Sequence, residues 1–381
     1  MVWWNTLRLK SSSPEVRCKA LENLDPTRDA RSLELLLASF GDEDAQVRCA
    51  AVKGLGQAKD DQSMITLTTA LKDPDSGVRE AAAAALGRVG DPRTLPHLAN
   101  LLKDSIPGVR TSAAAALRTL GWKPSTSEEQ AVFEVALGNT RAAALAGQAA
   151  VKALVTELKH DTSFKRRAAA EALEDVDDPR ATQPLLAALK DEDPTVRVSA
   201  VHALSKDASA EVTVKLLERF RDPEPCVRLA AAEVLSKRID PALAPDFLSL
   251  LGDPNFEVRL SAVQFLGRIR HPQIAEALLP LLAGSDSDVR HAVAQALGTM
   301  GEPAAIEGLV LALTDEERAV RHAAEAALGR IDANWASSEA AQRASPQLEA
   351  SLNDPRGWVR SAAAQVLAKL QIPSAGLQAA G

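Results

Sequence analysis

The sequence predicts an all-α protein, an α-solenoid that winds as a right-handed superhelix of about eleven two-helix repeats. Three observations predict this class: a Val-Arg pair that recurs every 31 residues, a leucine at constant distance behind it, and an unusual wealth of alanine. A single short helix pair cannot bury its apolar face alone, so stacking on similar neighbours must complete the burial. We therefore expect an elongated array of helix pairs rather than a globule.

The repeated arginine defines the frame of each unit. It stands at Arg17, Arg48, Arg79, Arg110, Arg166, Arg197, Arg228, Arg259, Arg290, Arg321 and Arg360. Valine precedes it in every unit except at Lys165, alanine or Val293 follows three residues later, and leucine follows seven residues later. These positions share one stripe of an α-helix, which we predict to be the buried face of the second helix in each unit. Glycine often follows that leucine, as at Gly56 and Gly267, and we expect it to end the helix in the left-handed conformation.

Composition supports closely packed helices and excludes several classes of function. The chain of 381 residues holds 71 alanines, and aromatic residues make up only 3% of it. The net charge of −7 argues against a nucleic-acid partner or an anionic lipid surface. No run of apolar residues is long enough for a transmembrane segment. Three cysteines without a CxxC pair suit a reducing compartment, so we expect a cytoplasmic protein.

An aspartate six residues before the arginine is the second recurrent polar feature, and proline often follows it. We expect this aspartate to cap the second helix, with proline in the first turn. The aspartates are Asp42, Asp73, Asp104, Asp191, Asp222, Asp253, Asp315 and Asp354. With this feature the units resemble HEAT repeats, specifically the short phycobilisome-lyase-like subclass. The resemblance implies that these aspartates and the arginines form a ladder of hydrogen bonds between successive repeats, so the arginines are structural and not a phosphate-binding patch.

Three units depart from the pattern of that family. Ser11, His160 and Gly284 replace the aspartate in the first, fifth and ninth units, and the fifth also has Lys165 before its arginine. The resemblance implies that the ladder is weak at these points.

The frame divides the chain into seven segments. We expect a cap segment over 1–10, repeats 1–4 over 11–120, a helical insert over 121–147, repeats 5–10 over 148–331, a loop insert over 332–345, a terminal repeat over 346–371 and a tail over 372–381.

Tryptophans mark the insert and the N-terminal end. The insert carries a predicted helix that starts near Ser127, and we expect it to be a packed spacer that buries Trp122 and Phe133, with a docking element as the alternative. Trp3 and Trp4 are expected to cover the first repeat; anchoring to a partner or a membrane surface is the alternative.

Candidate binding residues lie one and five positions after the arginine, because these positions point away from the buried stripe and toward the concave groove. Three successive apolar residues, Val198, Leu229 and Leu260, form a candidate contact strip there, unless tight curvature hides them. The candidate set for binding a partner is Val198, His202, Leu229, Glu233, Leu260, Gln264, His291 and His322.

Metal, cofactor and catalytic sites are not predicted. His291 and His322 occupy the same register, but two histidines without a further ligand make a poor zinc site, so we assign no metal and no cofactor. Cys18 and Cys49 also share a register, yet neighbouring repeats separate Cα atoms by roughly 9–10 Å, too far for a disulfide. Cys226 is expected to be a small filler.

Enzymatic motifs such as a P-loop or H-E-x-x-H are missing from the sequence. Deoxyhypusine hydroxylase, a HEAT-like enzyme, binds iron through His-Glu dipeptides, whereas no histidine here precedes glutamate. The HEAT-like DNA glycosylases need a basic groove, whereas this groove carries several carboxylates. We therefore expect a protein that is not an enzyme, with a lyase-type activity left open.

Two hypotheses of function remain. The first is a non-catalytic scaffold that binds one or more proteins with basic or apolar surfaces on its concave face. The alternative, from the lyase-type resemblance, is a subunit of a bilin lyase or of a related chromophore or maturation system. A designed repeat array is disfavoured because the units differ from one another and carry two irregular inserts.

Overall fold

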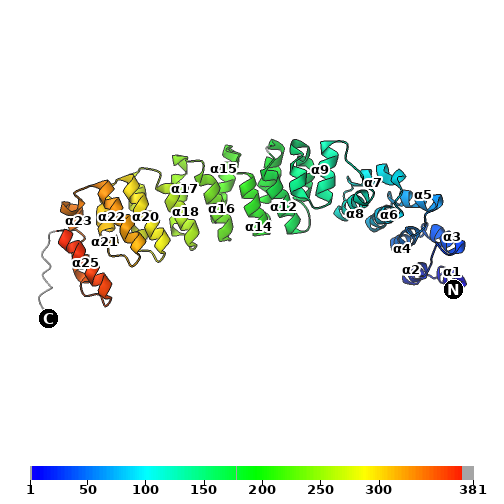
Figure 1. Ribbon diagram of the computed structural model, residues 1–381, viewed down its shortest axis with the longest axis horizontal. Helices are drawn as coiled ribbons and strands as arrows, with labels where there is room; N and C mark the ends of the chain where they lie inside the picture. The colour runs from blue at the N-terminus through cyan, green and yellow to red at the C-terminus, as the bar shows by residue number, and fades with distance from the viewer. Residues whose placement is uncertain (1, 177, 371–381) are drawn as a thin grey trace. The chain divides into compact units, whose positions relative to one another are not determined.

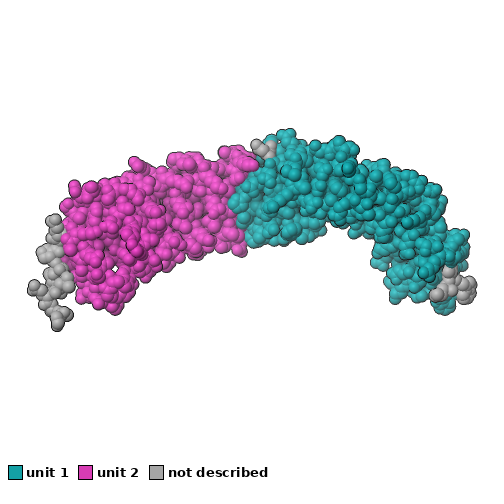
Figure 2. Space-filling view, viewed as in Figure 1, with its two compact units in different colours: residues 1–203 teal, residues 204–381 magenta. Residues whose placement is uncertain are grey.

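The structure is a computed structural model that describes residues 2–176 and 178–370. These residues form helices, turns and loops and contain no strand, as the sequence predicts for an all-α array. The chain divides into two compact units, residues 1–203 and residues 204–381 (Figure 2). Each unit is an α-solenoid in which helix pairs stack in chain order (Figure 1).

In the first unit, each repeat consists of a shorter first helix and a second helix that carries the repeated arginine. The first helices are α1 (Val2–Arg8), α3 (Ala30–Ser39), α5 (Asp61–Ala70), α7 (Leu95–Leu101), α11 (Val151–Glu157) and α13 (Thr182–Ala188). The second helices are α2 (Pro14–Glu22), α4 (Ala45–Leu55), α6 (Ser76–Val89), α8 (Pro107–Thr119), α12 (Ser163–Glu174) and α14 (Pro194–Ala203). Short 3-10 turns, η1 (Pro92–Thr94) and η3 (Pro179–Ala181), lead into α7 and α13.

The second unit continues the same alternation. Its first helices are α15 (Ala210–Leu217), α17 (Ala244–Ser249), α19 (Pro272–Leu278), α21 (Ile306–Ala312) and α24 (Ser345–Ser351). Its second helices are α16 (Pro225–Ser236), α18 (Phe256–Leu266), α20 (Ser287–Met300), α22 (Arg318–Ile331) and α25 (Gly357–Lys369). The 3-10 turns beside the first helices are η4 (Glu218–Arg221), η5 (Pro241–Leu243), η6 (Leu250–Gly252), η7 (Leu279–Ala283) and η8 (Pro303–Ala305).

The core runs through the predicted stripe of each second helix. In α4, for example, Val47, Ala51 and Leu55 are all fully buried. Within each unit, consecutive second helices pack directly on one another, from α2 through α8, from α12 to α14, and from α16 through α22. Alanine at these contacts lets helix axes approach closely, which explains why the core needs so little aromatic volume.

The prediction that glycine after the leucine ends the helix in the left-handed conformation is wrong. Gly56 and Gly267 have φ angles of −64° and −61°. A Cβ on either glycine would lie 2.7 Å from the Cβ of Ala85 or Ala296 in the next second helix. Glycine is therefore required by the close approach of neighbouring helices. The left-handed stops come later, as at Gly90 with a φ of 81°.

The prediction that the repeated aspartate caps the second helix is also wrong. The cap of α4 is Asp44, which accepts hydrogen bonds from the backbone N–H groups of Gln46 and Val47. Asp42 lies two residues earlier and accepts from the N–H of Asp44 at 2.9 Å. Its proline neighbours, such as Pro74 after Asp73, accordingly precede the helix instead of forming its first turn. The carboxylate of Asp42 instead accepts hydrogen bonds from the side chain of Arg17.

The insert contains two helices where the sequence predicts one, α9 (Ser127–Ala136) and α10 (Thr140–Ala144), followed by η2 (Gly147–Ala149). The N-cap of α9 is Thr126. Helix α9 packs on α8, while α10 packs on α9 and α12, so the insert fills the space between two second helices. Phe133 is buried, and the half-buried Trp122 meets its ring edge-on with centroids 5.3 Å apart.

The expected loop over 332–345 instead contains η9 (Trp335–Ser337) and the short helix α23 (Glu339–Gln342), and Trp335 is buried. At the other end, residues 1–10 contain α1, which packs on α2 and α3. Trp4 on this helix is 59% exposed, so it does not cover the first repeat in the way expected. The side chain of Trp3 and the tail over 372–381 lie outside the described residues.

Candidate interaction grooves

Arginine–aspartate hydrogen bonds fix the spacing of the second helices on which the candidate residues lie. Arg48 donates from Nε and Nη2 to the two carboxylate oxygens of Asp73 in the next repeat, at 2.8 and 2.9 Å. Its Nη1 donates to the backbone carbonyls of Asp42 and Glu43, both at 3.0 Å. We call each such arginine–carboxylate pair a rung. Rungs with both bonds join Arg17 to Asp42, Arg48 to Asp73, Arg79 to Asp104, Arg166 to Asp191, Arg228 to Asp253, and Arg290 to Asp315.

The rung from Arg48 keeps the carboxylate of Asp73 ionised. Burial raises the pKa of the Asp73 carboxyl, but the bond from Arg48, the N–H of Asp75 and the charges of Arg48 and Arg79 together outweigh it. The net pKa of Asp73 is therefore below its usual 3.8. In the six rungs with both bonds, the Nε–Nη2 edge of each arginine is occupied by its aspartate and is not available to a phosphate.

At the fifth and ninth units, where a weak ladder is predicted, other carboxylates take the vacant positions, and each accepts one hydrogen bond from its arginine instead of two. Glu157, three residues before His160, accepts from Arg110 Nη2 at 2.7 Å, and both side chains are buried. Asp286, two residues after Gly284, pairs with Arg259. In the first unit, the carbonyl of Ser11 accepts from Arg17 Nη1 at 2.9 Å. A carboxylate at this position would have no partner in the ladder, because Arg17 is the first of the repeated arginines.

Three further members of the predicted ladder, Arg197, Asp222 and Arg360, make the following contacts. Arg197 donates to the carbonyls of Asp191 and Glu192 at 2.9 and 3.2 Å. Asp222 accepts from the N–H of Glu224 at 3.1 Å. Arg360 likewise donates to the carbonyls of Asp354 and Pro355.

Two hollows lie between consecutive second helices, in the same register but in different units. The N-terminal groove, between α2 and α4, has a volume of about 580 Å³ and is lined by Cys18, Glu22, Gln46, Cys49, Lys53 and Asp75 among others. The C-terminal groove, between α18 and α20, has a volume of about 560 Å³ and is lined by Leu260, Gln264, Arg268, Asp288, His291 and Gln295 among others. Both are lined by the positions one and five residues after the repeated arginine.

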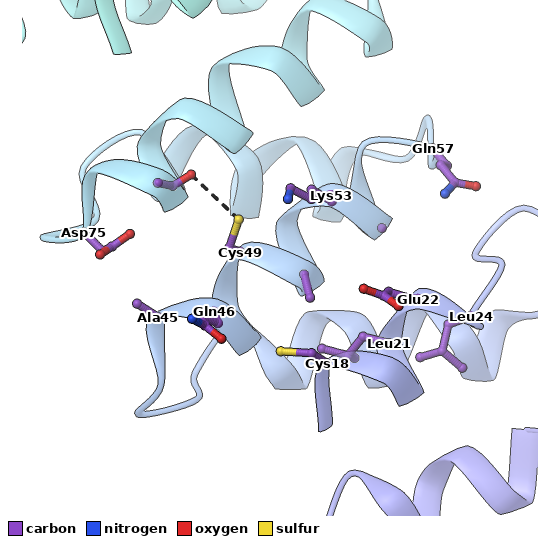
Figure 3. Close-up of a pocket in the computed structure, with 13 residues that line it drawn as sticks. Cys18, Leu21, Glu22, Leu24, Ala45, Gln46, Cys49, Lys53, Gln57 and Asp75 are labelled. Atoms are coloured by element: carbon purple, nitrogen blue, oxygen red, sulfur yellow. Dashed lines mark hydrogen bonds between the residues drawn. The ribbon is translucent and has the colours of Figure 1, made fainter. Parts of the chain in front are cut away.

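Figure 3 shows the N-terminal groove, with Cys49 on α4 above Cys18 on α2 and with the polar side chains of Glu22 and Lys53 also lining it. The Cys49 thiol donates to the carbonyl of Gly77 at 3.8 Å. Burial, followed by the charges of Asp44 and Glu22, raises the pKa of the Cys18 thiol. Cys18 is therefore a neutral thiol near pH 7, the opposite of an activated nucleophile.

Comparison with known protein families identifies the family to which this chain belongs. HEAT repeats match residues 6–69, 33–118, 136–205, 151–236, 213–294 and 275–368. The chain belongs to the HEAT-repeat family. Among curated proteins, no sequence matches it. Human deoxyhypusine hydroxylase in complex with glycerol is a similar solved structure, with 22% identity over 78% of this chain and 95% of that chain and a TM-score of 0.29. An engineered protein is 20% identical over 97% of this chain and 98% of its own, with a TM-score of 0.28.

The HEAT repeats bring three of the predicted contact residues together: Leu260, Gln264 and His291 line the C-terminal groove. The expected apolar strip is less accessible than predicted, because Val198, Leu229 and Leu260 are all half-buried. Val198 and the half-buried His202 lie on α14 in the first unit, whereas Leu229 and the exposed Glu233 lie on α16 in the second.

His291 and His322, which occupy the same register in consecutive repeats, form separate contacts. His291 lies 3.2 Å from the amide of Gln295, and His322 accepts from Arg318 Nε at 3.0 Å. No cluster of metal-ligating side chains occurs among the described residues. The described cysteines Cys18, Cys49 and Cys226 are unpaired, and Cys226 is exposed instead of filling a core.

The sequence does not predict the N-terminal groove, although Cys18 and Cys49 lie one residue after the repeated arginine, at the offset that lines it.

None of the helices in the described ranges combines the length and the apolarity that crossing a bilayer requires.

Proposed function

We propose that this HEAT-repeat protein is a non-catalytic scaffold that binds partner proteins in the grooves between consecutive second helices. The observation that carries the proposal is the pair of grooves in one register, lined by different side chains on a constant frame. A frame held by buried rungs, with variable residues between them, suits recognition of a protein surface. Nucleophilic catalysis in a groove needs an activated nucleophile. In the N-terminal groove the raised pKa of the Cys18 thiol argues against such a nucleophile.

The partner presents apolar and basic groups. The C-terminal groove offers the aliphatic side chain of Leu260 and the carboxylate of Asp288, and the N-terminal groove offers Glu22 and Asp75. The net charge of −7 also attracts a positively charged partner at long range. Unpaired cysteines and a net negative charge fit the cytoplasm, where we place the protein.

The test compares proteins that co-purify with the wild type and with Leu260→Asp, identified by cross-linking and mass spectrometry. Val214→Asp is the matched control, since Val214 is an apolar residue, 55% exposed, on the first helix α15. We expect Leu260→Asp to lose a reproducible partner that Val214→Asp retains. Equal capture by all three proteins, or no partner at all, would overturn the proposal.

The second candidate, a bilin lyase or maturation subunit, is favoured by the short repeat of 31 residues. Mixing the protein with phycocyanobilin and an apo-phycobiliprotein tests it. A gain of visible absorbance on the phycobiliprotein, dependent on this chain, would support the candidate, and an unchanged spectrum would reject it.

A further inference from the structure

The rung that should join the tenth and eleventh repeats is missing. Arg321 Nη1 donates to the carbonyls of Asp315 and Glu316 at 2.6 and 2.8 Å, as in the other repeats. Its expected acceptor, Asp354, is instead held by Arg356, whose Nε and Nη2 donate to it at 2.9 and 3.0 Å. The Nε–Nη2 edge of Arg321 has no hydrogen-bond partner among the described residues and is not buried. In the six rungs that have both bonds, the Nε–Nη2 edge of the arginine binds the two carboxylate oxygens of the aspartate.

The helix contact next to this rung is missing as well. A Cβ on Gly298 of α20 would lie 2.6 Å from the Cβ of Ala327, whereas a Cβ on Gly329 of α22 would meet nothing within 4 Å. Ala326 and His322 on the same helix are exposed. Helix α22 thus presents the features of a stacking surface without the packed helix that covers the equivalent surface elsewhere.

The eight additional residues before the last repeat explain the gap. Arg321 and Arg360 are 39 residues apart instead of 31, and the added chain forms η9 and α23. Helix α25 packs extensively on α24 but not on α22, and it is tied to α22 by the ion pair of Lys369 with Glu325 at 2.8 Å. The final repeat therefore leaves Arg321 and Gly329 unmatched.

We propose that the face of α22 around Arg321 and Gly329 binds a helical segment of a partner protein, with an aspartate ahead of the helix and a small residue twelve positions later. This spacing is the one by which Asp73 meets Arg48 while Ala85 meets Gly56. The guanidinium edge supplies charge complementarity for the aspartate, since a bidentate arginine–carboxylate pair is a strong and geometrically specific contact. A second copy of this chain does not supply the segment through its first repeat, because Ser11 stands at the aspartate position.

The probe is a fluorescein-labelled peptide of residues 73–89 of this chain, which contains both Asp73 and Ala85. Binding to the full-length protein is followed by fluorescence anisotropy. We expect saturable binding that weakens about tenfold or more when the peptide carries Asp73→Asn, because a charge-assisted bond is lost. Arg321→Gln in the protein should weaken binding to a similar extent.

A second variant separates binding from folding. Gly329→Leu keeps the guanidinium but fills the open space beside it, and it should also weaken binding. Arg330→Gln removes the same charge from an exposed position on α22 and should leave binding unchanged, with circular dichroism melts confirming that all variants are folded.

Three results would overturn the proposal: no binding of the peptide, equal binding of the Asp73→Asn peptide, or equal binding by Arg321→Gln. Self-association of the wild type that Arg321→Gln abolishes would also overturn it, by showing that a second copy occupies the face. The C-terminal groove lies between α18 and α20, so the Leu260→Asp experiment can fail or succeed independently of this one.

Discussion

Gly298 on α20 and Ala327 on α22 lie so close that a Cβ on the glycine would be 2.6 Å from the alanine Cβ and 2.7 Å from its Cα. The same offset brings Gly56 against Ala85 and Gly267 against Ala296. Consecutive second helices are therefore held at a distance that tolerates no added methyl group at this point.

Gly298→Ala should lower the free energy of unfolding by about 1–3 kcal/mol, because the added carbon forces the helices apart. Gly329→Ala is the matched control: it also lies in a helix, and its Cβ would meet no atom within 4 Å. The control should be neutral or stabilise by up to about 1 kcal/mol through helix propensity. Urea unfolding measures both, and equal effects would contradict the packing argument.

Glu157→Ala should lower the free energy of unfolding by about 3–5 kcal/mol, because it leaves the guanidinium of Arg110 buried without its carboxylate. The two residues are 5% and 8% exposed, and their bond is 2.7 Å long. The double variant Arg110→Met with Glu157→Leu should recover most of the loss, since no charge then remains buried. A single variant that unfolds like the wild type would show that the unpaired guanidinium of Arg110 carries no such cost.

The sequence predicts the repeat frame, the helix pairs and the buried stripe because these depend on local periodicity. It does not predict the role of Gly56, since a glycine behind a leucine is equally compatible with a helix end and with a close helix contact. Only the position of Ala85 in the next repeat distinguishes the two.

The substitute rungs were missed for a related reason. Glu157 and Asp286 lie three and two residues away from the expected positions, so their arginines are found only when the helices are placed in space. The accessible area of Leu260 also depends on its neighbours, which is why offset alone predicts that it lines a groove but not that it is half-buried.

Asp73 should make the stability of the protein depend on pH in the acid range. Its folded pKa is lowered, so the carboxylate stabilises the fold fully above the unfolded pKa of about 3.9, and that contribution is lost as pH falls through the folded value. Asp73→Asn should therefore cost about 1.5–3 kcal/mol at pH 7. The difference in the free energy of unfolding between the wild type and Asp73→Asn should become smaller at pH values well below the unfolded pKa of about 3.9. Urea unfolding at several pH values checks this, and a difference independent of pH would contradict it.

Ile239 has a φ of 50°, and among the described residues it is the one residue other than glycine with a positive φ. Its side chain is 63% exposed. A β-branched residue in this region brings Cβ against the backbone and costs roughly 1–2 kcal/mol. The preceding Arg238 donates to the Thr213 hydroxyl and to the carbonyl of Asp207 at 2.8 Å, and these bonds to the preceding repeat hold the chain in this conformation.

Ile239→Asn should therefore raise the midpoint of urea unfolding, by about 1 kcal/mol in free energy, because asparagine tolerates the left-handed conformation. Ile65→Asn is the matched control, since Ile65 is 59% exposed but lies within the regular helix α5. There the same change removes only a better helix former and should be neutral or slightly destabilising. If both substitutions shifted the midpoint in the same direction by the same amount, the gain at Ile239 would come from replacing an exposed apolar side chain with a polar one and not from the relief of backbone strain.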